Sequence, residues 1–127
     1  MRVLICDDEP LASQRLADLL TRCAGVEVVG SASNGQEALQ LVSTVKPDLL
    51  LLDIEMPRFD GFDVVEELSM AQRSGPGEPP LIIFVTAYPR FAANAFDASA
   101  LDFLTKPVRH SRLESALAKA RGEQVPA

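Results

Sequence analysis

The sequence has few of the features that stabilise secreted or membrane proteins. Only two of its 127 residues are cysteines, Cys6 and Cys23, and both lie in apolar segments without the CxxC spacing of metal or redox sites. A disulfide framework is therefore not expected. No apolar run approaches the roughly 20 residues that a membrane helix needs, and the first residues do not resemble a secretory signal. We expect a cytoplasmic protein without a membrane partner.

The chain also lacks an excess of basic residues. It has 12 Lys and Arg against 18 Asp and Glu, which gives a formal net charge of −6. Nucleic-acid recognition normally requires a basic patch, and the basic residues here are scattered. We therefore expect that this chain itself binds no nucleic acid. Its 47% hydrophobic and 24% charged residues are typical of a globular protein, and its length fits one domain.

Short apolar runs alternate with helical patterns five times along the chain. The runs are residues 3–6, 26–29, 49–52, 81–85 and 101–104. The apolar residues are continuous rather than alternating, interrupted only by Glu27 and Asp102, which indicates strands buried on both faces, as in a parallel sheet covered by helices. Five such units with right-handed crossovers predict a doubly wound, flavodoxin-like α/β fold, a three-layer sandwich with strand order 2-1-3-4-5.

The segments between the runs carry apolar residues at helical spacing. Ser33 with Gln36 three residues later predicts a capping box at the start of the second helix. The Gly- and Pro-rich stretch 74–80 predicts a loop before the fourth strand. We assign residues 1–121 to one domain, and residues 122–127 to a tail or the start of a linker.

Polar groups follow four of the five predicted strands. Asp7 and Asp8 follow the first strand, Asp53 the third, Thr86 the fourth and Lys106 the fifth. Ligands of open α/β sheets bind beyond the carboxyl ends of the strands, so these side chains are expected to share one site. An aspartate at a strand end is usually a turn or capping residue, and the coincidence of all five groups is what favours a functional site.

The crowding of acidic groups predicts a metal ion. If the first and third strands are neighbours, their ends lie about 5 Å apart and three carboxylates occupy one cleft. Carboxylates this close raise each other's pKa unless a cation compensates them. Mg²⁺ fits because it accepts one or two carboxylates while keeping waters and phosphoryl oxygens, and Mn²⁺ is a possible substitute. No other cofactor is expected.

The same groups fit phosphoryl transfer. An aspartate carboxylate can attack phosphorus and form an aspartyl phosphate, which makes Asp53 the candidate acceptor. Phosphoryl transfer depends mainly on positioning and on neutralising the phosphoryl oxygens. Mg²⁺, the Lys106 ammonium and the Thr86 hydroxyl are the candidates for that role.

The order and spacing of these motifs resemble the receiver domain of bacterial response regulators, the chemotaxis-type receiver fold. The matching motifs are Asp7-Asp8, the four leucines before Asp53 with Met56-Pro57 and Asp60-Gly61 after it, Val85-Thr86-Ala87, and Lys106-Pro107. The match covers residues 2 to about 121. A finer resemblance to the LytTR-type (LytR/AlgR-like) subfamily rests on Cys-Asp-Asp-Glu-Pro-Leu-Ala at 6–12, Leu-Asp-Ile-Glu-Met-Pro at 52–57 and Thr86-Ala87-Tyr88.

The resemblance implies specific roles and partners. Asp53 would take a phosphoryl group from a sensor histidine kinase, and Asp7, Asp8, Asp53 and the Glu55 backbone carbonyl would hold Mg²⁺. Thr86 and Phe103 would form the switch. The Lys106–Pro107 bond would be cis.

The resemblance also implies an output. Phosphorylation would change the face made by the fourth helix, fifth strand and fifth helix, where Phe91 and Phe96 motivate a homodimer interface. A LytTR-type DNA-binding domain, absent from this chain, would then control transcription. Such a domain is a signalling phospho-acceptor rather than an enzyme, since it catalyses only its own phosphorylation and dephosphorylation.

Two alternatives remain. A haloacid-dehalogenase-type phosphatase also places a nucleophilic aspartate after an apolar strand, but its Asp-x-Asp motif is not present because position 55 is Glu. A pseudo-receiver would dock a partner without ever being phosphorylated. The intact set of Asp7, Asp8, Asp53, Thr86 and Lys106 argues against the latter.

Overall fold

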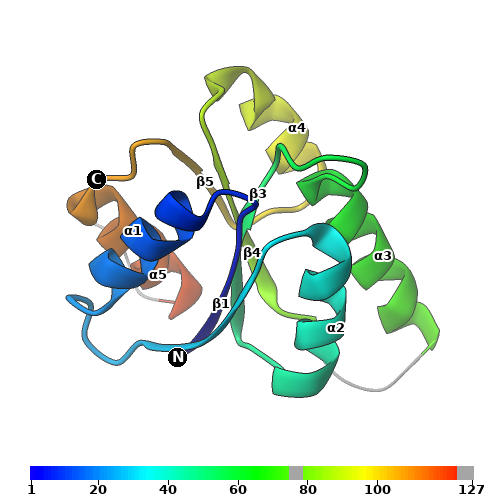
Figure 1. The fold of residues 1–127 in the computed structure, drawn as a ribbon, viewed down its shortest axis with the longest axis horizontal. Helices are drawn as coiled ribbons and strands as arrows, with labels where there is room; N and C mark the ends of the chain where they lie inside the picture. The colour runs from blue at the N-terminus through cyan, green and yellow to red at the C-terminus, as the bar shows by residue number, and fades with distance from the viewer. Residues whose placement is uncertain (75–78, 123–127) are drawn as a thin grey trace.

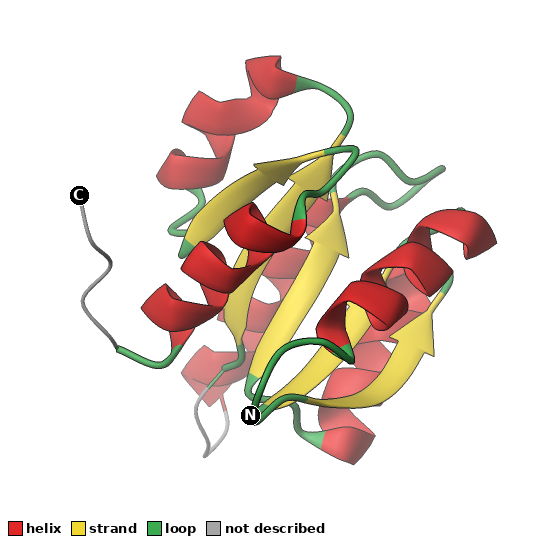
Figure 2. Cartoon of the chain, turned by 90° about the vertical axis from the view of Figure 1, so that its left-hand side faces the viewer, coloured by secondary structure: helices red, strands yellow, loops and turns green. Residues whose placement is uncertain are grey.

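The structure is a computed structural model that describes residues 1–74 and 79–122, with the backbone alone for residues 72–74. Strands and helices alternate along the chain (Figures 1 and 2). The strands are β1 Arg2–Cys6, β2 Glu27–Ala32, β3 Leu49–Asp53, β4 Leu81–Thr86 and β5 Asp102–Thr105. The helices are α1 Pro10–Leu20, α2 Gly35–Val45, α3 Gly61–Ser74, α4 Ala92–Asp97 and α5 His110–Ala120, with a 3₁₀ turn at Pro89–Phe91.

The described strands form one parallel sheet in the order β2-β1-β3-β4-β5. Helices α1 and α5 cover one face, and α2 and α3 cover the other (Figure 1). The predicted doubly wound fold and its strand order are confirmed. Strand β2 is added on one side of β1, whereas β3, β4 and β5 are added on the other side. The order of strand addition therefore reverses between β1 and β3, and folds of this kind place their ligands at that point.

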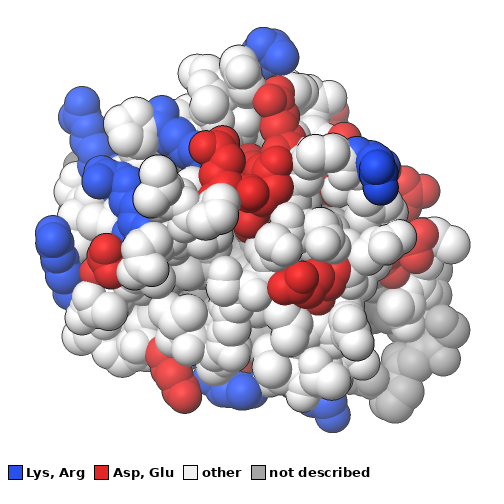
Figure 3. All heavy atoms as spheres, viewed as in Figure 1, with Lys and Arg blue, Asp and Glu red and all other residues white. Residues whose placement is uncertain are grey.

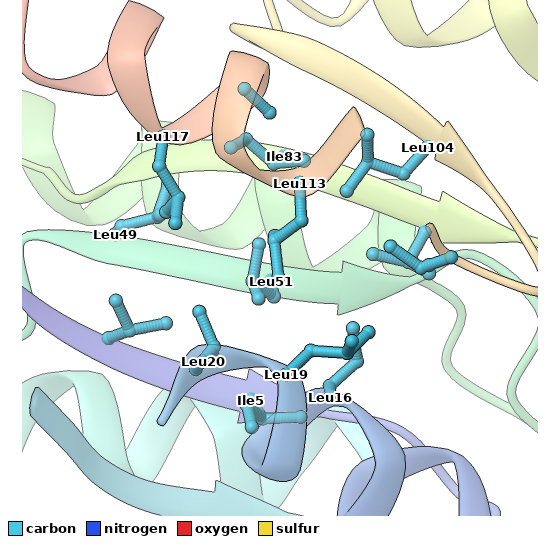
Figure 4. Packing of buried hydrophobic residues seen from close by; sticks show 14 of the residues in the cluster. Ile5, Leu16, Leu19, Leu20, Leu49, Leu51, Ile83, Leu104, Leu113 and Leu117 are labelled. Carbon is cyan, nitrogen blue, oxygen red and sulfur yellow. The ribbon is translucent and has the colours of Figure 1, made fainter. Parts of the chain in front are cut away.

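The alternation of side chains along each strand divides the core in two. In β1, β3 and β4, odd-numbered positions such as Ile5, Leu51 and Ile83 pack with α1 and α5, as the close view of this cluster shows (Figure 4). Even-numbered positions such as Leu4 and Leu52 pack beneath α2 and α3. All four leucines of β3 are 0% exposed, so the central strand is held firmly from both faces.

The edge strand β2 departs from the prediction. It runs from Glu27 to Ala32 rather than over 26–29, and only Ala32 is buried within it. Val28 is 37% exposed. The apolar sequence predicted that this strand is buried on both faces, and that prediction is wrong. Strand β2 lies at the edge of the sheet, where no further strand helps to cover its side chains. The fifth strand is likewise displaced by one residue, to Asp102–Thr105.

The predicted cap of the second helix is wrong by one residue. Asn34, not Ser33, is the N-cap, and its side chain accepts a hydrogen bond of 2.8 Å from the Glu37 N–H. The Ser33 hydroxyl instead donates to the Glu37 carboxylate at 3.2 Å. Gln36 has no part in the cap. The helix therefore begins at Gly35, one position later than the Ser33 cap predicted.

Two segments singled out in the sequence lie wholly or partly outside the described residues. These are positions 75–78 of the predicted loop and positions 123–127 of the predicted tail. Within the described residues, every helix is too short or too polar to span a bilayer. The Lys106–Pro107 bond is cis, as the resemblance implied.

Candidate functional site

The predicted site residues converge at the carboxyl ends of neighbouring strands. Asp7 follows β1, Asp53 is the last residue of β3, Thr86 ends β4, and Lys106 comes directly after β5. Figure 3 shows acidic side chains gathered over this end of the sheet. The carboxylate oxygens of Asp7, Asp8 and Asp53 lie within 4.8 Å of one another. The sheet order thus brings together residues as far apart in sequence as Asp7 and Lys106, which are 99 positions apart.

The two central carboxylates are buried beside an ammonium group. Asp7 is 2% exposed and Asp53 is 4% exposed, whereas Asp8 lies nearer the surface. The Lys106 Nζ lies 2.8 Å from Asp7 Oδ2 and 3.6 Å from Asp53 Oδ2. The Lys106 ammonium therefore pairs with two of the three clustered carboxylates, which leaves the cluster with an uncompensated negative charge among the described residues.

That imbalance is visible in the acidity of Asp53. Burial and the neighbouring Asp7 charge raise the pKa of Asp53 to about 7, against the lowering effect of Lys106. For Lys106, burial lowers the pKa, but its contacts with Asp7 and Asp53 outweigh burial and raise it overall. Lys106 therefore stays charged at neutral pH, while Asp53 without further compensation is only partly ionised.

The donor set fits a hard divalent cation. Asp7 Oδ2 is buried and, among the described residues, has the Lys106 ammonium as its ionic partner but no hydrogen bond of good geometry. An oxygen in that position is available to a metal ion. The three carboxylates offer oxygen atoms alone, which suits Mg²⁺ or Mn²⁺ rather than softer metals. A cation there would also offset the charge that raises the pKa of Asp53.

Thr86 and Phe103 occupy neighbouring strands of the same site. Thr86 is 0% exposed, and its hydroxyl accepts a 3.2 Å hydrogen bond from the Tyr88 N–H. In the β4–β5 pairing, Phe84 lies opposite Phe103 and Thr86 lies opposite Thr105. Because side chains two apart on a strand point to the same face, Thr86 and the half-buried Phe103 share one face of the sheet.

The loop after β3 is closed onto the strand by its backbone. The Gly61 N–H donates to the Ile54 carbonyl at 2.9 Å. A Cβ at Gly61 would lie only 2.6 Å from the Asp53 carbonyl oxygen, so this position requires glycine. Asp60 and Asp63 cap α3 reciprocally, each carboxylate accepting a 2.9 Å bond from the other's N–H. This loop thereby fixes the segment that carries Asp53 and Glu55.

An open cleft of about 420 Å³ lies beside the carboxylates. Its lining includes Asp8, Glu55, Pro57 and Phe91. The Glu55 side chain lies 3.7 Å from the Arg90 guanidinium, which in turn stacks over the Tyr88 ring at 4.5 Å. The cleft is therefore bordered by a salt bridge that joins the loop after β3 to the loop after β4.

The sequence reasoning missed one ionic cluster close to the switch position. Asp102 is 3% exposed, and Arg112 donates to both of its carboxylate oxygens at 2.6 and 3.0 Å. Arg112 also donates to the Phe103 carbonyl at 3.2 Å, and the Lys119 Nζ lies 3.3 Å from Asp102. The available signal was an acidic residue inside the fifth predicted strand, with basic residues 10 and 17 positions later on the last helix.

Fold and site together define a receiver domain, and comparison with known families agrees. Residues 3–118 match the model of the response regulator receiver domain, so the chain belongs to that family. It is 50% identical over 121 residues to the positive alginate biosynthesis regulatory protein of Pseudomonas aeruginosa, covering 94% of this chain and 47% of that protein.

A second relative is the transcriptional regulatory protein BtsR of Escherichia coli, 41% identical over 98% of this chain and 49% of that protein. These relatives agree with the LytTR-type subfamily predicted from the motifs. The chain spans about half the length of these curated relatives. Their names describe regulatory proteins, and response regulators are signalling proteins rather than conventional enzymes.

Solved structures show the same fold. The response regulatory domain of mrkE from Klebsiella pneumoniae superposes with a TM-score of 0.82 at 34% identity, covering 96% of both chains. The receiver domain of the response regulator NarL from Mycobacterium tuberculosis gives a TM-score of 0.83 at 30% identity, over 96% of this chain and 97% of that one. Neither comparison supports the dehalogenase-type alternative.

Proposed function

We propose that Asp53 accepts a phosphoryl group from a sensor histidine kinase, in a reaction that depends on Mg²⁺. The observation that carries this proposal is a cluster of three carboxylates at the carboxyl edge of the sheet, of which the two buried ones pair with the Lys106 ammonium. A purely structural cluster would be expected to balance its charges. This one is short of positive charge, as the pKa of Asp53 near 7 reflects.

Each residue has a defined part in the transfer. An Asp53 carboxylate oxygen forms a bond to phosphorus while the phosphorus–nitrogen bond of the kinase phosphohistidine breaks, and the histidine nitrogen takes up a proton. Lys106, 3.6 Å from Asp53, is placed to pair with a phosphoryl oxygen. Asp7, Asp8, Asp53 and the Glu55 carbonyl would hold Mg²⁺, which supplies positive charge to the phosphoryl oxygens.

The cleft beside the site provides access for the donor. Its lining by Asp8 and Glu55 places it against the proposed metal ligands, and the Arg90 guanidinium stands at its border. Glu55 is exposed and lies two residues beyond Asp53, so it borders the route of a water molecule that would hydrolyse the aspartyl phosphate. The Glu55–Arg90 pair is therefore a candidate determinant of how long the phosphorylated state lasts.

Phosphorylation would be read out through Thr86 and Phe103. A phosphoryl group at Asp53 offers acceptor oxygens to which the Thr86 hydroxyl can donate, and this draws Thr86 away from the Tyr88 N–H from which its oxygen now accepts. A shift of Thr86 frees space on the sheet face that it shares with Phe103. We propose that the surface of α4, β5 and α5 then forms a homodimer, with Phe96, which is 64% exposed, as an apolar contact.

The output of this switch is proposed to be transcription control. The chain covers just under half of the regulatory proteins that it matches, so those proteins contain a further part of comparable length. In the LytTR-type subfamily that part is a DNA-binding domain. The present chain, with a net charge of −6, would act on DNA only through such a domain.

Phosphorylation is tested by incubating the protein with acetyl phosphate and Mg²⁺ and then measuring its intact mass. We expect a gain of one phosphoryl group, abolished in Asp53→Ala and retained in Asp18→Ala, an exposed aspartate on α1. A pseudo-receiver would remain unmodified. A phosphatase-type enzyme would instead turn over acetyl phosphate continuously without keeping a stoichiometric adduct.

Dimer formation is tested separately by sedimentation with and without beryllofluoride, which mimics the bound phosphoryl group. We expect the sedimenting mass to double with beryllofluoride, and Phe96→Ser to weaken that association. An unchanged mass at high protein concentration would contradict the dimer but leave the phosphorylation proposal intact.

A further inference from the structure

A second group of metal-binding side chains lies apart from the acidic cluster, where α1 meets α5. Cys23, His110 and Glu114 each offer one ligand atom, and these atoms lie within 4.8 Å of one another. The His110 Nε2 is 4.0 Å from the Cys23 Sγ and 3.3 Å from Glu114 Oε1. The receiver function described above uses none of these three residues.

The fold holds the three side chains together from two separate segments. His110 and Glu114 are four residues apart on α5, which places them on one face of that helix. Cys23 follows the end of α1 and packs in the same core cluster as Leu113 and Leu117 of α5. The pairing of α1 with α5 therefore sets the position of the thiol relative to the other two groups before any ligand binds.

The three side chains differ in their exposure to solvent. Cys23 is 5% exposed, whereas the side chains of His110 and Glu114 are 41% and 39% exposed. A metal ion could therefore enter from solvent past His110 and Glu114 and reach the sulfur beneath them. The exposed side leaves room for a water molecule as a further ligand.

We propose that Cys23, His110 and Glu114 form a zinc-binding site, with water as the fourth ligand. Thiolate, imidazole and carboxylate together are the ligand types that Zn²⁺ takes in proteins. Zinc–ligand bonds of about 2.0–2.3 Å in a tetrahedral arrangement place ligand atoms roughly 3.4–3.6 Å apart. The 3.3 Å and 4.0 Å separations from His110 are within about half an ångström of that spacing, and the Cys23 and Glu114 ligand atoms lie within 4.8 Å of each other. Closing these gaps requires side-chain adjustment alone.

The ligand types separate this site from the acidic cluster. Mg²⁺ prefers oxygen ligands and is poorly bound by sulfur and nitrogen. The carboxylates around Asp53 offer oxygen atoms alone, while the site at Cys23 offers one sulfur, one nitrogen and one oxygen. The same chain would thus hold magnesium at the sheet edge and zinc between α1 and α5.

Two features of the surroundings oppose metal binding at Cys23. Burial and the nearby Glu114 raise the pKa of the Cys23 thiol to about 11, so zinc must displace its proton. The Arg121 guanidinium also acts on Cys23 electrostatically and repels a dication, although it donates to the Ala24 carbonyl. The site is therefore expected to be weaker than a four-ligand structural zinc site.

The test uses Co²⁺ as a spectroscopic substitute for zinc, with the whole chain and Mg²⁺ in excess to occupy the acidic cluster. We expect near-ultraviolet thiolate-to-cobalt absorption that saturates at one Co²⁺ per chain and is removed by adding Zn²⁺. Cys23→Ser abolishes this band. Cys6→Ala, which removes the other thiol, and Asp53→Asn, which disables the acidic cluster, both retain it.

His110→Gln and Glu114→Gln provide the quantitative part of the test. Both residues are about two-fifths exposed, so these variants fold even if Cys23→Ser does not. Zinc affinity, measured by competition with a chromogenic chelator, should fall by more than the roughly 10- to 100-fold that losing an outer-shell partner costs. Cobalt binding without the thiolate band, or an unchanged zinc affinity in both glutamine variants, would overturn the proposal.

Discussion

The Lys106 ammonium lies 2.8 Å from Asp7 Oδ2, closer than its 3.6 Å approach to Asp53 Oδ2. In this structure the cation therefore pairs chiefly with the carboxylate of β1, and it spans from β5 to β1 across the ends of β3 and β4. Asp53 lies between these two groups with less than full charge compensation. This arrangement leaves Lys106 within reach of a phosphoryl group on Asp53 while it still contacts Asp7.

Removing that ammonium should make Asp53 harder to ionise. Burial and the charges of Asp7 and Asp8 raise the pKa of Asp53, and Lys106 lowers it, so that the result is about 7. Lys106→Met should therefore raise the Asp53 pKa above 7 in metal-free protein. Carboxyl carbon chemical shifts followed against pH by NMR measure this change. Lys119→Met, which removes a lysine paired with Asp102, is the matched control and should leave Asp53 unchanged.

Neutralising Asp53 should stabilise the metal-free protein. Because the Asp53 pKa is raised from an unfolded value near 3.9 to about 7 by folding, wild-type stability should fall as pH rises from about 4 to 7. Asp53→Asn removes this loss. We expect the variant to gain on the order of 4 kcal/mol in unfolding free energy at pH 8, measured by urea denaturation with a chelator present.

The gain in unfolding free energy of Asp53→Asn should depend on both pH and Mg²⁺ concentration. At pH 4, where Asp53 is protonated in the wild type, the two proteins should be nearly equally stable. Saturating Mg²⁺ should reduce the difference at pH 8, because the cation compensates the charge that the variant lacks. If the unfolding free energies of the wild type and Asp53→Asn differed by the same amount under all these conditions, the gain in stability would not be electrostatic in origin.

Gly61 should not tolerate a side chain. An added Cβ would come within 2.6 Å of the Asp53 carbonyl oxygen and 3.0 Å of the Ile54 Cα, and both are backbone atoms that cannot rotate away. Gly61→Ala should destabilise the fold by about 1–3 kcal/mol. At the control position Gly30 the nearest atom is the Leu4 Cδ1 at 3.2 Å, a side-chain atom that can move. Thermal unfolding of both variants should show the larger loss at Gly61.

The Asp102–Arg112 pair should stabilise the protein above pH 4. Burial raises the pKa of Asp102, but the bonds from Arg112 and the Phe103 N–H outweigh burial and lower it overall. A depressed pKa contributes stability above the unfolded value near 3.9 and loses it as pH falls further. Asp102→Asn should cost about 1–3 kcal/mol at pH 7 by urea denaturation and less at pH 3. An equal cost at both pH values would argue for packing rather than charge.

The continuous apolar strands made the fold and the carboxyl edge of the sheet predictable. Four leucines before Asp53 can only be buried on both faces, and a central parallel strand then follows. The edge strand β2 was misread because its apolar residues are half exposed, and sequence alone does not show which strand lacks a neighbour. The cap at Asn34 was missed by one residue because Ser33 is an equally good capping residue.

The members of the acidic site were predictable as a set, but their pairing was not. Strand ends placed Asp7, Asp53 and Lys106 together, yet the closer contact of Lys106 with Asp7 depends on side-chain geometry that sequence does not encode locally. The Asp102–Arg112 pair and the clustering of Cys23 with His110 depend on how α5 packs. Contacts of this kind join residues from different layers of the fold.

The central claim is that the phosphoryl group is carried by Asp53 itself. Treating the phosphorylated protein with borohydride reduces an aspartyl phosphate to homoserine, and peptide mass spectrometry locates that residue. We predict homoserine at position 53 alone, only in samples given both a phosphodonor and Mg²⁺, and none in Asp53→Asn. Homoserine at Asp7 or Asp8, or its absence from a protein that has gained phosphoryl mass, would contradict the account.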